Sequence, residues 1–309
     1  MAGINAERVG AWLEANVAGA KAPFTYTLIA GGHSNLTFKV DDSAGHHYVL
    51  RRPPLSHALA SAHDMGREHR VISALSASRV PVAPALGLCT DVEVNDAPFY
   101  VMAFVDGHVV RDNATALSVL TPATRRQASI SLVDTMAAIH KVDPVAVGLG
   151  DLGRHEGYIE RQLKRWYGQW NASKTRELSA IDRVHDALVT RVPEQGPATI
   201  VHGDYRLDNC MVDDSGNVIA VLDWELCTLG DPMADLGLLM VYWTGPHDEA
   251  STTTSPARMD SANGSPTGHL SYRLRLGWRG RRGSSKTQRG PFARSSRGSS
   301  RVRRTRVTC

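Results

Sequence analysis

The chain has 309 residues with 35 Lys and Arg against 31 Asp and Glu, but the net charge of +4 combines two segments of opposite sign. Residues 251–309 carry 13 Arg and one Lys against a single acid, whereas residues 1–250 are acidic, so the pI near 8.9 does not indicate a basic, nucleic-acid-binding fold. Four cysteines without a CxxC spacing exclude a disulfide framework, and no apolar run approaches the ~18 residues of a membrane span.

The first 105 residues predict a helix followed by short strands. Residues 1–20 are amphipathic and contain Glu7 and Glu14, which favours a helix over a signal peptide. A helix is also expected over residues 61–78. Five β-rich stretches predict a small antiparallel sheet with a meander at its start: residues 24–29, 35–41 and 47–50, and the stretches around Gly87 and Pro98.

From residue 106 the pattern becomes mainly helical. Helices and short strands are expected in the following order: helices 121–140, 157–172 and 176–191, strands 198–201, 210–212 and 218–222, and a helix over 232–243. A sheet with one helix, followed by a mostly helical part, predicts the α+β class arranged in two lobes. We place the N-terminal lobe at residues 1–105 and the helical lobe at 106–246.

Residues 247–309 differ in composition from the rest. Ser, Thr, Gly and Arg make up 38 of the last 59 residues, without apolar periodicity. Such a composition buries too little apolar surface to offset chain entropy, which predicts a disordered basic tail. An arginine-rich, nearly acid-free segment is typical of an out-of-frame reading of a GC-rich gene. The alternative is a basic arm for nucleic acid, which the scarcity of interleaved aromatic residues does not favour.

The strongest chemical pattern is the segment from His202 to Asn209, HGDYRLDN, which follows an apolar strand, with Asp223 leaving another strand 14 residues later. Phosphoryl transfer to a hydroxyl needs one carboxylate that orients the nucleophile, and an amide and a second carboxylate that bind magnesium. Asp204, Asn209 and Asp223 supply that set at the spacing of a kinase catalytic loop. A surface turn rich in Asp and Asn is the structural alternative.

These motifs resemble the aminoglycoside phosphotransferase (choline kinase-like) family, and the resemblance extends over residues 20–245. Three further motifs are similar to a subgroup associated with acyl-CoA dehydrogenases: Tyr48 to Pro54, Asp223-Trp224-Glu225, and Gly230-Asp231-Pro232 with Asp235. The family implies a protein-kinase-like fold with a small antiparallel-sheet lobe and a mostly helical lobe. The resemblance also implies that the helical lobe is truncated here, with the family's later helices replaced by the tail.

The resemblance also assigns roles to individual residues. It makes Asp204 the catalytic base, and Asn209 and Asp223 the magnesium ligands on ATP. His202 is then a residue that structures the loop, and Asp235 braces the loop from below.

The N-terminal lobe would contact the nucleotide. Gly31, Gly32, Ser34 and Asn35 lie between two strands, where backbone N–H groups can cover phosphates; an ordinary hairpin turn is the alternative. The resemblance gives Arg51 the place of the kinase strand lysine, where a guanidinium can hold phosphate oxygens bidentately; a surface arginine is the alternative.

Glu68 lies in the middle of the apolar face of the helix predicted over 61–78. Apolar residues flank it at helical spacing: Met65, Ile72 and Leu75. A carboxylate there is costly unless it is paired, and the kinase arrangement gives it Arg51 as a partner. A bent helix that exposes the side chain is the alternative. Arg52 is expected to face solvent.

The apolar run that ends the N-terminal lobe, Met102 to Val105, is expected to form the hinge between the lobes. Its backbone groups would pair there with the edge of adenine, which makes Met102 a candidate nucleotide-binding residue. A buried strand end has the same sequence pattern.

Together, these patterns predict an ATP- and Mg-dependent phosphotransferase that phosphorylates a hydroxyl of a small molecule. The subgroup implies lipid or acyl-CoA metabolism, with a hydroxyacyl-CoA as acceptor and an acyl-CoA dehydrogenase as partner. The alternatives are a catalytically impaired or non-catalytic nucleotide-binding product of a frameshifted gene, and an RNA-binding protein. Membrane and nucleic acid are not expected partners, and the reduced thiols favour the cytoplasm.

Overall fold

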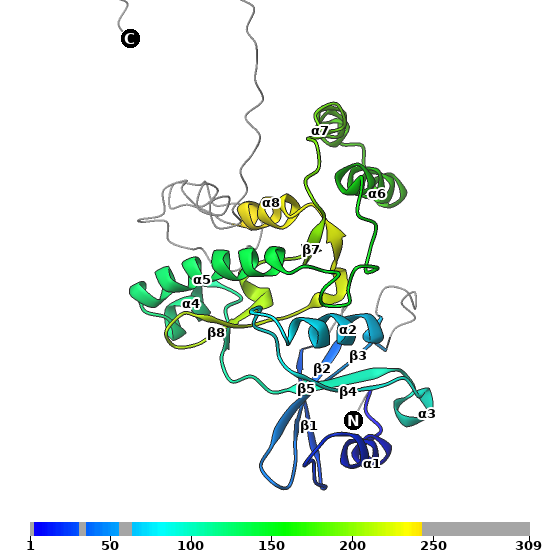
Figure 1. Ribbon diagram of the computed structural model, residues 1–309, viewed down its shortest axis with the longest axis vertical. Helices are drawn as coiled ribbons and strands as arrows, with labels where there is room; N and C mark the ends of the chain where they lie inside the picture. The colour runs from blue at the N-terminus through cyan, green and yellow to red at the C-terminus, as the bar shows by residue number, and fades with distance from the viewer. Residues whose placement is uncertain (1–2, 31–34, 56–63, 243–309) are drawn as a thin grey trace, which may run out of the picture. The chain divides into compact units, whose positions relative to one another are not determined.

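The N-terminal lobe is built on a five-stranded antiparallel sheet in the computed structural model, which describes residues 3–30, 35–55 and 64–242. Its strands are β1 (Thr25–Ala30), β2 (Leu36–Asp41), β3 (His47–Arg52), β4 (Ala85–Cys89) and β5 (Phe99–Ala103). The order is β1-β2-β3-β5-β4, which confirms the meander predicted for the first three strands (Figure 1). The last two strands return as an antiparallel pair, and β5 completes the hydrogen bonding of β3.

The two faces of this sheet carry different helices, because successive side chains of a strand point to opposite faces. One face packs against α1 (Ala6–Asn16) and α3 (Val92–Asn95) through a cluster that includes Leu50. The other face packs against α2 (Met65–Leu75) through a second cluster that includes Val49. Each face therefore buries its own set of β3 side chains.

The helix predicted over 61–78 is shorter in the structure. It begins at Met65 because Asp64 caps it, with its carboxylate accepting a hydrogen bond from the backbone N–H of Arg67. Residues 61–63 lie outside the described residues. The apolar stripe of α2 includes Glu68, which is buried as the spacing predicts.

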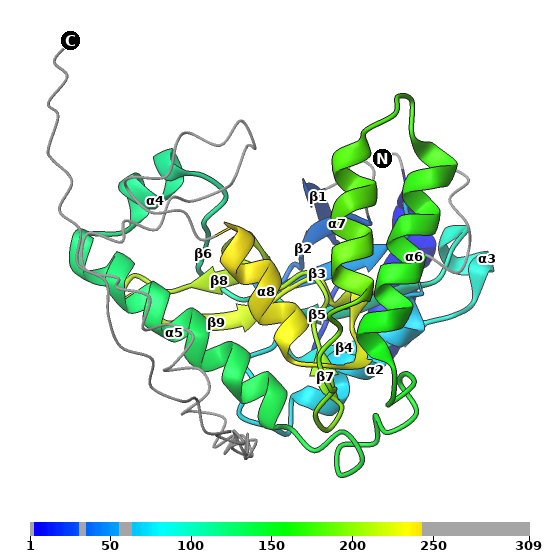
Figure 2. The same ribbon diagram turned by 90° about the horizontal axis from the view of Figure 1, so that it is seen from above.

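The C-terminal lobe is mostly helical. Its helices are α4 (Asn113–Val119), α5 (Pro122–Lys141), α6 (Tyr158–Ser173), α7 (Ser179–Val189) and α8 (Met233–Tyr242). Its strands and 3-10 turns are β6 (His108–Val109), β7 (Thr199–Val201), η1 (Leu207–Asn209), β8 (Cys210–Val212), β9 (Val218–Val221), η2 (Trp224–Leu226) and β10 (Thr228–Gly230). Figure 2 shows α6 and α7 side by side as an antiparallel pair. The sequence did not predict α4, β6 or β10, because these elements are too short to show a helical or strand periodicity in their apolar residues.

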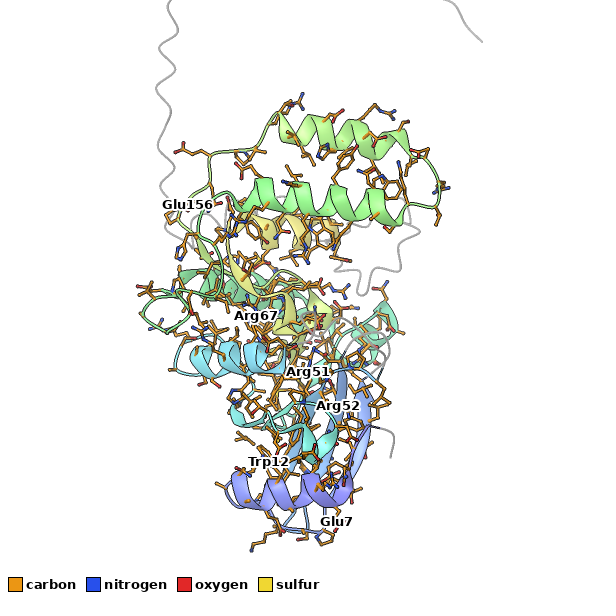
Figure 3. The ribbon with its side chains drawn as sticks, turned by 90° about the vertical axis from the view of Figure 1, so that its right-hand side faces the viewer. Glu7, Trp12, Arg51, Arg52, Arg67 and Glu156 are labelled. Carbon is orange, nitrogen blue, oxygen red and sulfur yellow. The ribbon has the colours of Figure 1, made fainter. Side chains whose placement is uncertain are left out.

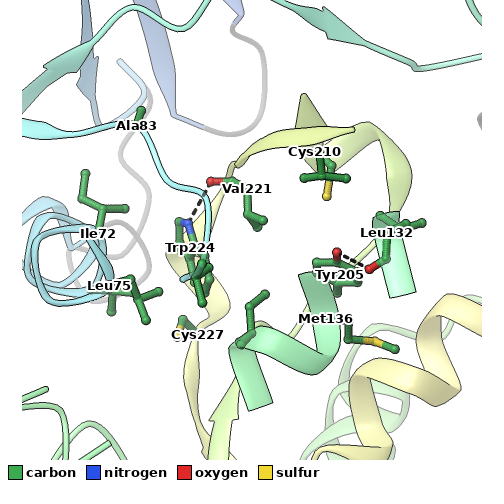
Figure 4. Packing of buried hydrophobic residues seen from close by; sticks show 14 of the residues in the cluster. Ile72, Leu75, Ala83, Leu132, Met136, Tyr205, Cys210, Val221, Trp224 and Cys227 are labelled. Carbon is green, nitrogen blue, oxygen red and sulfur yellow. Dashed lines mark hydrogen bonds between the residues drawn. The ribbon is translucent and has the colours of Figure 1, made fainter. Parts of the chain in front are cut away.

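One hydrophobic cluster joins α2 to the C-terminal lobe, and its largest members also satisfy their polar atoms (Figure 4). The indole N–H of Trp224 donates to the carbonyl of Val221 at 3.0 Å, and the hydroxyl of Tyr205 donates to the carbonyl of Leu132 at 2.7 Å. Side chains of this size each contribute about 2–3 kcal/mol when fully buried. The anchoring of Tyr205 and Trp224 fixes the two segments that carry the predicted site.

The described residues thus form the predicted α+β fold of two lobes, one built on an antiparallel sheet and one mostly helical. Residues 243–309, which include the predicted basic tail from residue 247, lie outside the described residues. Within the described ranges, every helix is too short or too polar to span a membrane.

Candidate active site

The loop after β7 is held from below by a buried carboxylate. Asp235, at the start of α8, accepts hydrogen bonds from the backbone N–H groups of His202 at 2.8 Å and Gly203 at 2.9 Å. His140 of α5 lies 2.9 Å from the same carboxylate. Burial acts to raise the pKa of Asp235, but the bonds from His140 and the loop outweigh it, and the pKa lies below its ordinary value. These hydrogen bonds are the contacts expected of a residue that braces the loop.

Glycine is required at position 203. Its φ is +87°, a left-handed conformation that side chains rarely adopt, and a Cβ atom there would lie 2.8 Å from the carbonyl oxygen of Leu226. His202 fixes the loop from within, because its ring contacts the carbonyl of Leu222 at 2.8 Å and the backbone N–H of Asp204 at 3.3 Å. This is the arrangement of a residue that structures the loop.

Asp204 and Asn209, five residues apart, meet across the loop. The amide nitrogen of Asn209 donates to the Asp204 carboxylate and to its backbone carbonyl, both at 2.8 Å. Because the nitrogen makes these bonds, the amide oxygen of Asn209 is turned away from Asp204. The backbone carbonyl of Asn209 accepts from the N–H of Leu222 at 2.8 Å, so Asn209 and Asp223 emerge from neighbouring strand ends.

Asp223 has an unusual backbone conformation, with φ 63° and ψ 62° in the left-handed region. Non-glycine residues in this region are strained, and such residues occur most often at functional sites. The strained turn directs the carboxylate of Asp223 to Arg51 of β3, whose guanidinium donates to it. The structure therefore brings Asp204, Asn209, Asp223 and Arg51 into one region.

Arg51 is buried among carboxylates. Its Nε lies 3.2 Å from an oxygen of Glu68, its Nη2 pairs with Asp223, and Glu225 lies 4.0 Å away. Glu68 also accepts from the hydroxyl of Tyr100 at 2.8 Å. The predicted pairing of Arg51 with Glu68 is thus present.

The pKa values follow from this burial. Burial raises the pKa of Glu68 to about 7, although Arg51 and Tyr100 act in the opposite direction. Burial acts to lower the pKa of Arg51, but Glu68, Tyr100 and Asp223 outweigh it and raise that pKa. Arg51 therefore stays charged, and the carboxylates around it outnumber the guanidinium.

Three carboxylates in this region have oxygens within 4.8 Å of one another, those of Glu68, Asp223 and Glu225. Carboxylate and amide oxygens are the hard donors that Mg²⁺ prefers. With Asn209 on the strand end next to that of Asp223, the donor types fit a divalent cation by their chemistry and by their negative charge.

Of the four residues predicted to cover the phosphates, the structure describes only Asn35. Gly31, Gly32 and Ser34 lie outside the described residues. Asn35 is buried, and its amide nitrogen donates to Glu68 at 2.9 Å and to Glu225 at 3.2 Å, so its side chain belongs to the carboxylate cluster.

Met102 is a buried residue of β5 opposite Val49 of β3 and Ala85 of β4. The next backbone N–H, that of Ala103, donates to the carbonyl of Pro84 at 2.8 Å. The N–H of Phe104 still donates to the carbonyl of His47 at 3.4 Å, and the chain then leaves the sheet before β6. Met102 thus lies just before the passage between the lobes.

The expectation that Arg52 faces solvent was wrong. It is 5% exposed, and its guanidinium donates to the carbonyls of Gly3, Asn95 and Pro53. The reason is that Arg52 shares a face of β3 with Leu50, and α1, α3 and the chain before α1 cover that face.

Sequence reasoning missed two contributors to the site. Tyr100 bonds to Glu68 from another strand, and Arg206 lies 3.4 Å from Asp204 and 3.1 Å from Asp208. The position of Arg206 between Asp204 and Asp208 was a usable signal. Tyr100 had none, because only the strand register places it on the face of Arg51.

Comparisons with known proteins identify the family to which the chain belongs. A family model described as "Phosphotransferase enzyme family" matches residues 25–254. Acyl-CoA dehydrogenase family member 10 of Mus musculus is 38% identical over 206 residues, which are 66% of this chain and 19% of that protein. The chain spans less than a third of the length of the curated relatives that it matches first.

Solved structures share the fold. A Ralstonia eutropha JMP134 protein assigned as an aminoglycoside phosphotransferase is 36% identical, with a TM-score of 0.73 over 88% of this chain and 80% of that chain. The streptomycin–ATP complex of APH(2")-IIa is 14% identical, with a TM-score of 0.53 over 76% and 75% of the two chains, and shows the fold alone. By the extent of the family match and the likeness to the R. eutropha protein, the chain belongs to the phosphotransferase enzyme family and has its kinase-like fold.

Proposed function

We propose that this protein transfers the γ-phosphoryl group of ATP, in a magnesium-dependent reaction, to a hydroxyl of a small molecule. The observation that carries the proposal is the convergence of Asp204, Asn209 and Asp223 beside the Arg51–Glu68 pair. These are the groups that phosphoryl transfer requires. A solved complex of the same fold contains ATP and streptomycin, which supports nucleotide use.

Asp204 is the proposed catalytic base. Its carboxylate would orient the acceptor hydroxyl and take its proton, while the amide of Asn209 and the guanidinium of Arg206 hold the carboxylate in position. Its side chain is 29% exposed, which leaves an open side for the acceptor. Mg²⁺, bound through Asn209 and Asp223, would neutralise charge on the phosphates.

The N-terminal lobe supplies the proposed nucleotide contacts. Arg51 would hold phosphate oxygens, because phosphate offers a guanidinium the same bidentate geometry as the carboxylates that it contacts now. Glu68 keeps Arg51 in place. The loop of Gly31, Gly32 and Ser34 is the proposed phosphate cover, with Asn35 anchoring its end, and Met102 marks the proposed adenine hinge.

A hydroxyacyl-CoA or related lipid metabolite is the proposed acceptor, and an acyl-CoA dehydrogenase the proposed partner. The support is that a relative is named acyl-CoA dehydrogenase family member 10, and that this chain matches only part of it. The proposed place of action is the cytoplasm.

Asp204→Asn tests the proposal. With ATP, Mg²⁺ and a panel of hydroxy acids and their CoA esters, ADP release should fall about 10²–10⁴-fold, because the acceptor proton loses its base. Affinity for Mg–ATP should change little. Asp186→Asn is the matched control, since Asp186 lies on α7 with a side chain that is 80% exposed.

Turnover by Asp204→Asn at the wild-type rate would contradict the proposed base. If wild-type protein binds Mg–ATP but turns over no acceptor, the alternative of a non-catalytic nucleotide-binding product replaces the proposal.

A further inference from the structure

A cavity of about 660 Å³ opens beside the catalytic loop. Its wall includes Gly203, which precedes Asp204, and Glu225, two residues after Asp223. The first turns of α6 and the starts of α2 and α8 complete the wall; in Figure 3, Arg67 and Glu156 mark the starts of α2 and α6. A cavity of this size accommodates a small molecule. A molecule held there would lie next to the loop that carries the proposed base.

The charged residues of this wall are mainly basic. Four arginines and two acids line it: Arg67, Arg154, Arg161, Arg165, Asp64 and Glu225. Both acids are engaged elsewhere, because Asp64 caps α2 and Glu225 accepts from Asn35 and lies 4.0 Å from Arg51. The four arginines outnumber the two acids, so the wall keeps an excess of positive charge.

Two of the arginines are fixed by neutral groups. Arg67 donates to the carbonyls of Leu152 at 2.7 Å and Cys227 at 2.9 Å, and Arg161 donates to backbone carbonyls just before α6. A carbonyl orients a guanidinium but leaves its charge in place. The guanidinium groups of Arg67 and Arg161 are therefore held in place and contribute positive charge to the wall of the cavity.

The other two arginines are exposed. In the described part of the chain, neither Arg154 nor Arg165 forms an ion pair with an acid, and the Arg165 guanidinium lies 5.4 Å from the ring centre of Trp166. The wall also has apolar surface, since Trp166 is 57% exposed and Leu226 is 45% exposed. The cavity thus combines free positive charge with apolar contacts.

We infer that this cavity binds an acceptor that carries phosphate or carboxylate groups on an apolar chain, and that Arg154 and Arg165 determine this specificity. Guanidinium groups recognise both anions through charge-assisted hydrogen bonds. A cationic acceptor such as an aminoglycoside is repelled by the same side chains. The inference rests on the proposed function, because it assigns the cavity to the acceptor of that reaction.

The test measures binding separately from turnover. Calorimetric titrations with coenzyme A, octanoate and octane-1,3-diol compare phosphate, carboxylate and neutral probes at low salt, on the wild type and on Arg154→Gln/Arg165→Gln. We expect an anionic probe to bind, with an affinity that falls about tenfold or more in the double variant and with rising salt, whereas the diol is unaffected. Arg183→Gln, an exposed arginine of α7, is the control and should bind as the wild type does.

Binding of coenzyme A but not octanoate would assign the cavity to phosphate, and the reverse to carboxylate; either result supports the inference. Failure of both anions to bind, or equal binding in the double variant, would overturn it. Mg–ATP titration of the same samples separates the two proposals, because intact Mg–ATP binding leaves the proposed function standing when the anion site fails.

Discussion

The two arginines that end β3, Arg51 and Arg52, are neighbours in sequence with different partners. Arg51, on the α2 face, lies among the carboxylates of Glu68 and Asp223, whereas Arg52, on the α1 face, donates only to backbone carbonyls among the described residues (Figure 3). Both are less than a tenth exposed. Burial and charge, which the two arginines share, therefore do not tell a candidate site residue from a structural residue here.

The partners do separate them. A guanidinium among carboxylates can exchange them for phosphate oxygens, since both anions accept bidentate bonds. A guanidinium bound to the carbonyls of Gly3, Pro53 and Asn95 ties three chain segments together and has no such exchange. We expect Arg51 to act in the reaction and Arg52 in stability.

Paired substitutions give the largest expected effect. Arg51→Gln should lower turnover about 10²-fold or more, because the proposed function loses the buried charge that would contact phosphate. Arg52→Gln should change turnover little and lower the free energy of unfolding by about 2–4 kcal/mol, because carbonyls are left unpaired. Steady-state kinetics and urea unfolding of both variants check this. Equal effects of the two variants on kcat would break the comparison.

The partners of Asp235 also indicate a role in stability, because they are backbone N–H groups of the catalytic loop and His140. Asp235→Asn should lower the free energy of unfolding by about 3 kcal/mol at neutral pH. The pKa of Asp235 is depressed in the folded state, so its contribution is present above the ordinary aspartate pKa and is lost as pH falls through the folded-state pKa. Unfolding curves at pH 7 and pH 3 measure this. A stability difference that grows on acidification would contradict it.

The smallest expected effect is a difference in alkylation rate between cysteines of the two hydrophobic clusters. Burial raises the pKa of Cys210 to about 12 and also raises that of Cys89. Cys89 belongs to the smaller cluster under α1, which should open at lower cost, so Cys89 should be alkylated before Cys210 in a Cys309→Ser background. Peptide mass spectrometry after timed iodoacetamide treatment gives the order. Faster labelling of Cys210 would reverse the ranking of the clusters.

Much of the fold and part of the site followed from local patterns. The spacing of Asp204, Asn209 and Asp223 predicted their loop, and the apolar neighbours of Glu68 predicted its burial. The alternation of β3 also carried a signal that was missed, since Arg52 follows Leu50 by two residues and therefore lies on the same covered face.

What could not be predicted depends on distant contacts. Asn35 meets Glu225 across 190 positions, and Tyr100 reaches Glu68 only through the pairing of β5 with β3. The basic cavity is of the same kind, because its arginines from α6 face residues of α2 and of the segment after Asp223 only in the folded chain.

In the proposed function, Asp223 binds the metal that accompanies ATP. The direct test of this role is the Mg²⁺ dependence of ATP affinity, measured by titration calorimetry on the wild type, on Asp223→Asn and on Asp214→Asn, a control in the β8–β9 turn with a side chain that is 93% exposed. We predict that Mg²⁺ tightens ATP binding about tenfold or more in the wild type and in Asp214→Asn, and that this gain is lost in Asp223→Asn. An unchanged gain in Asp223→Asn would contradict the account.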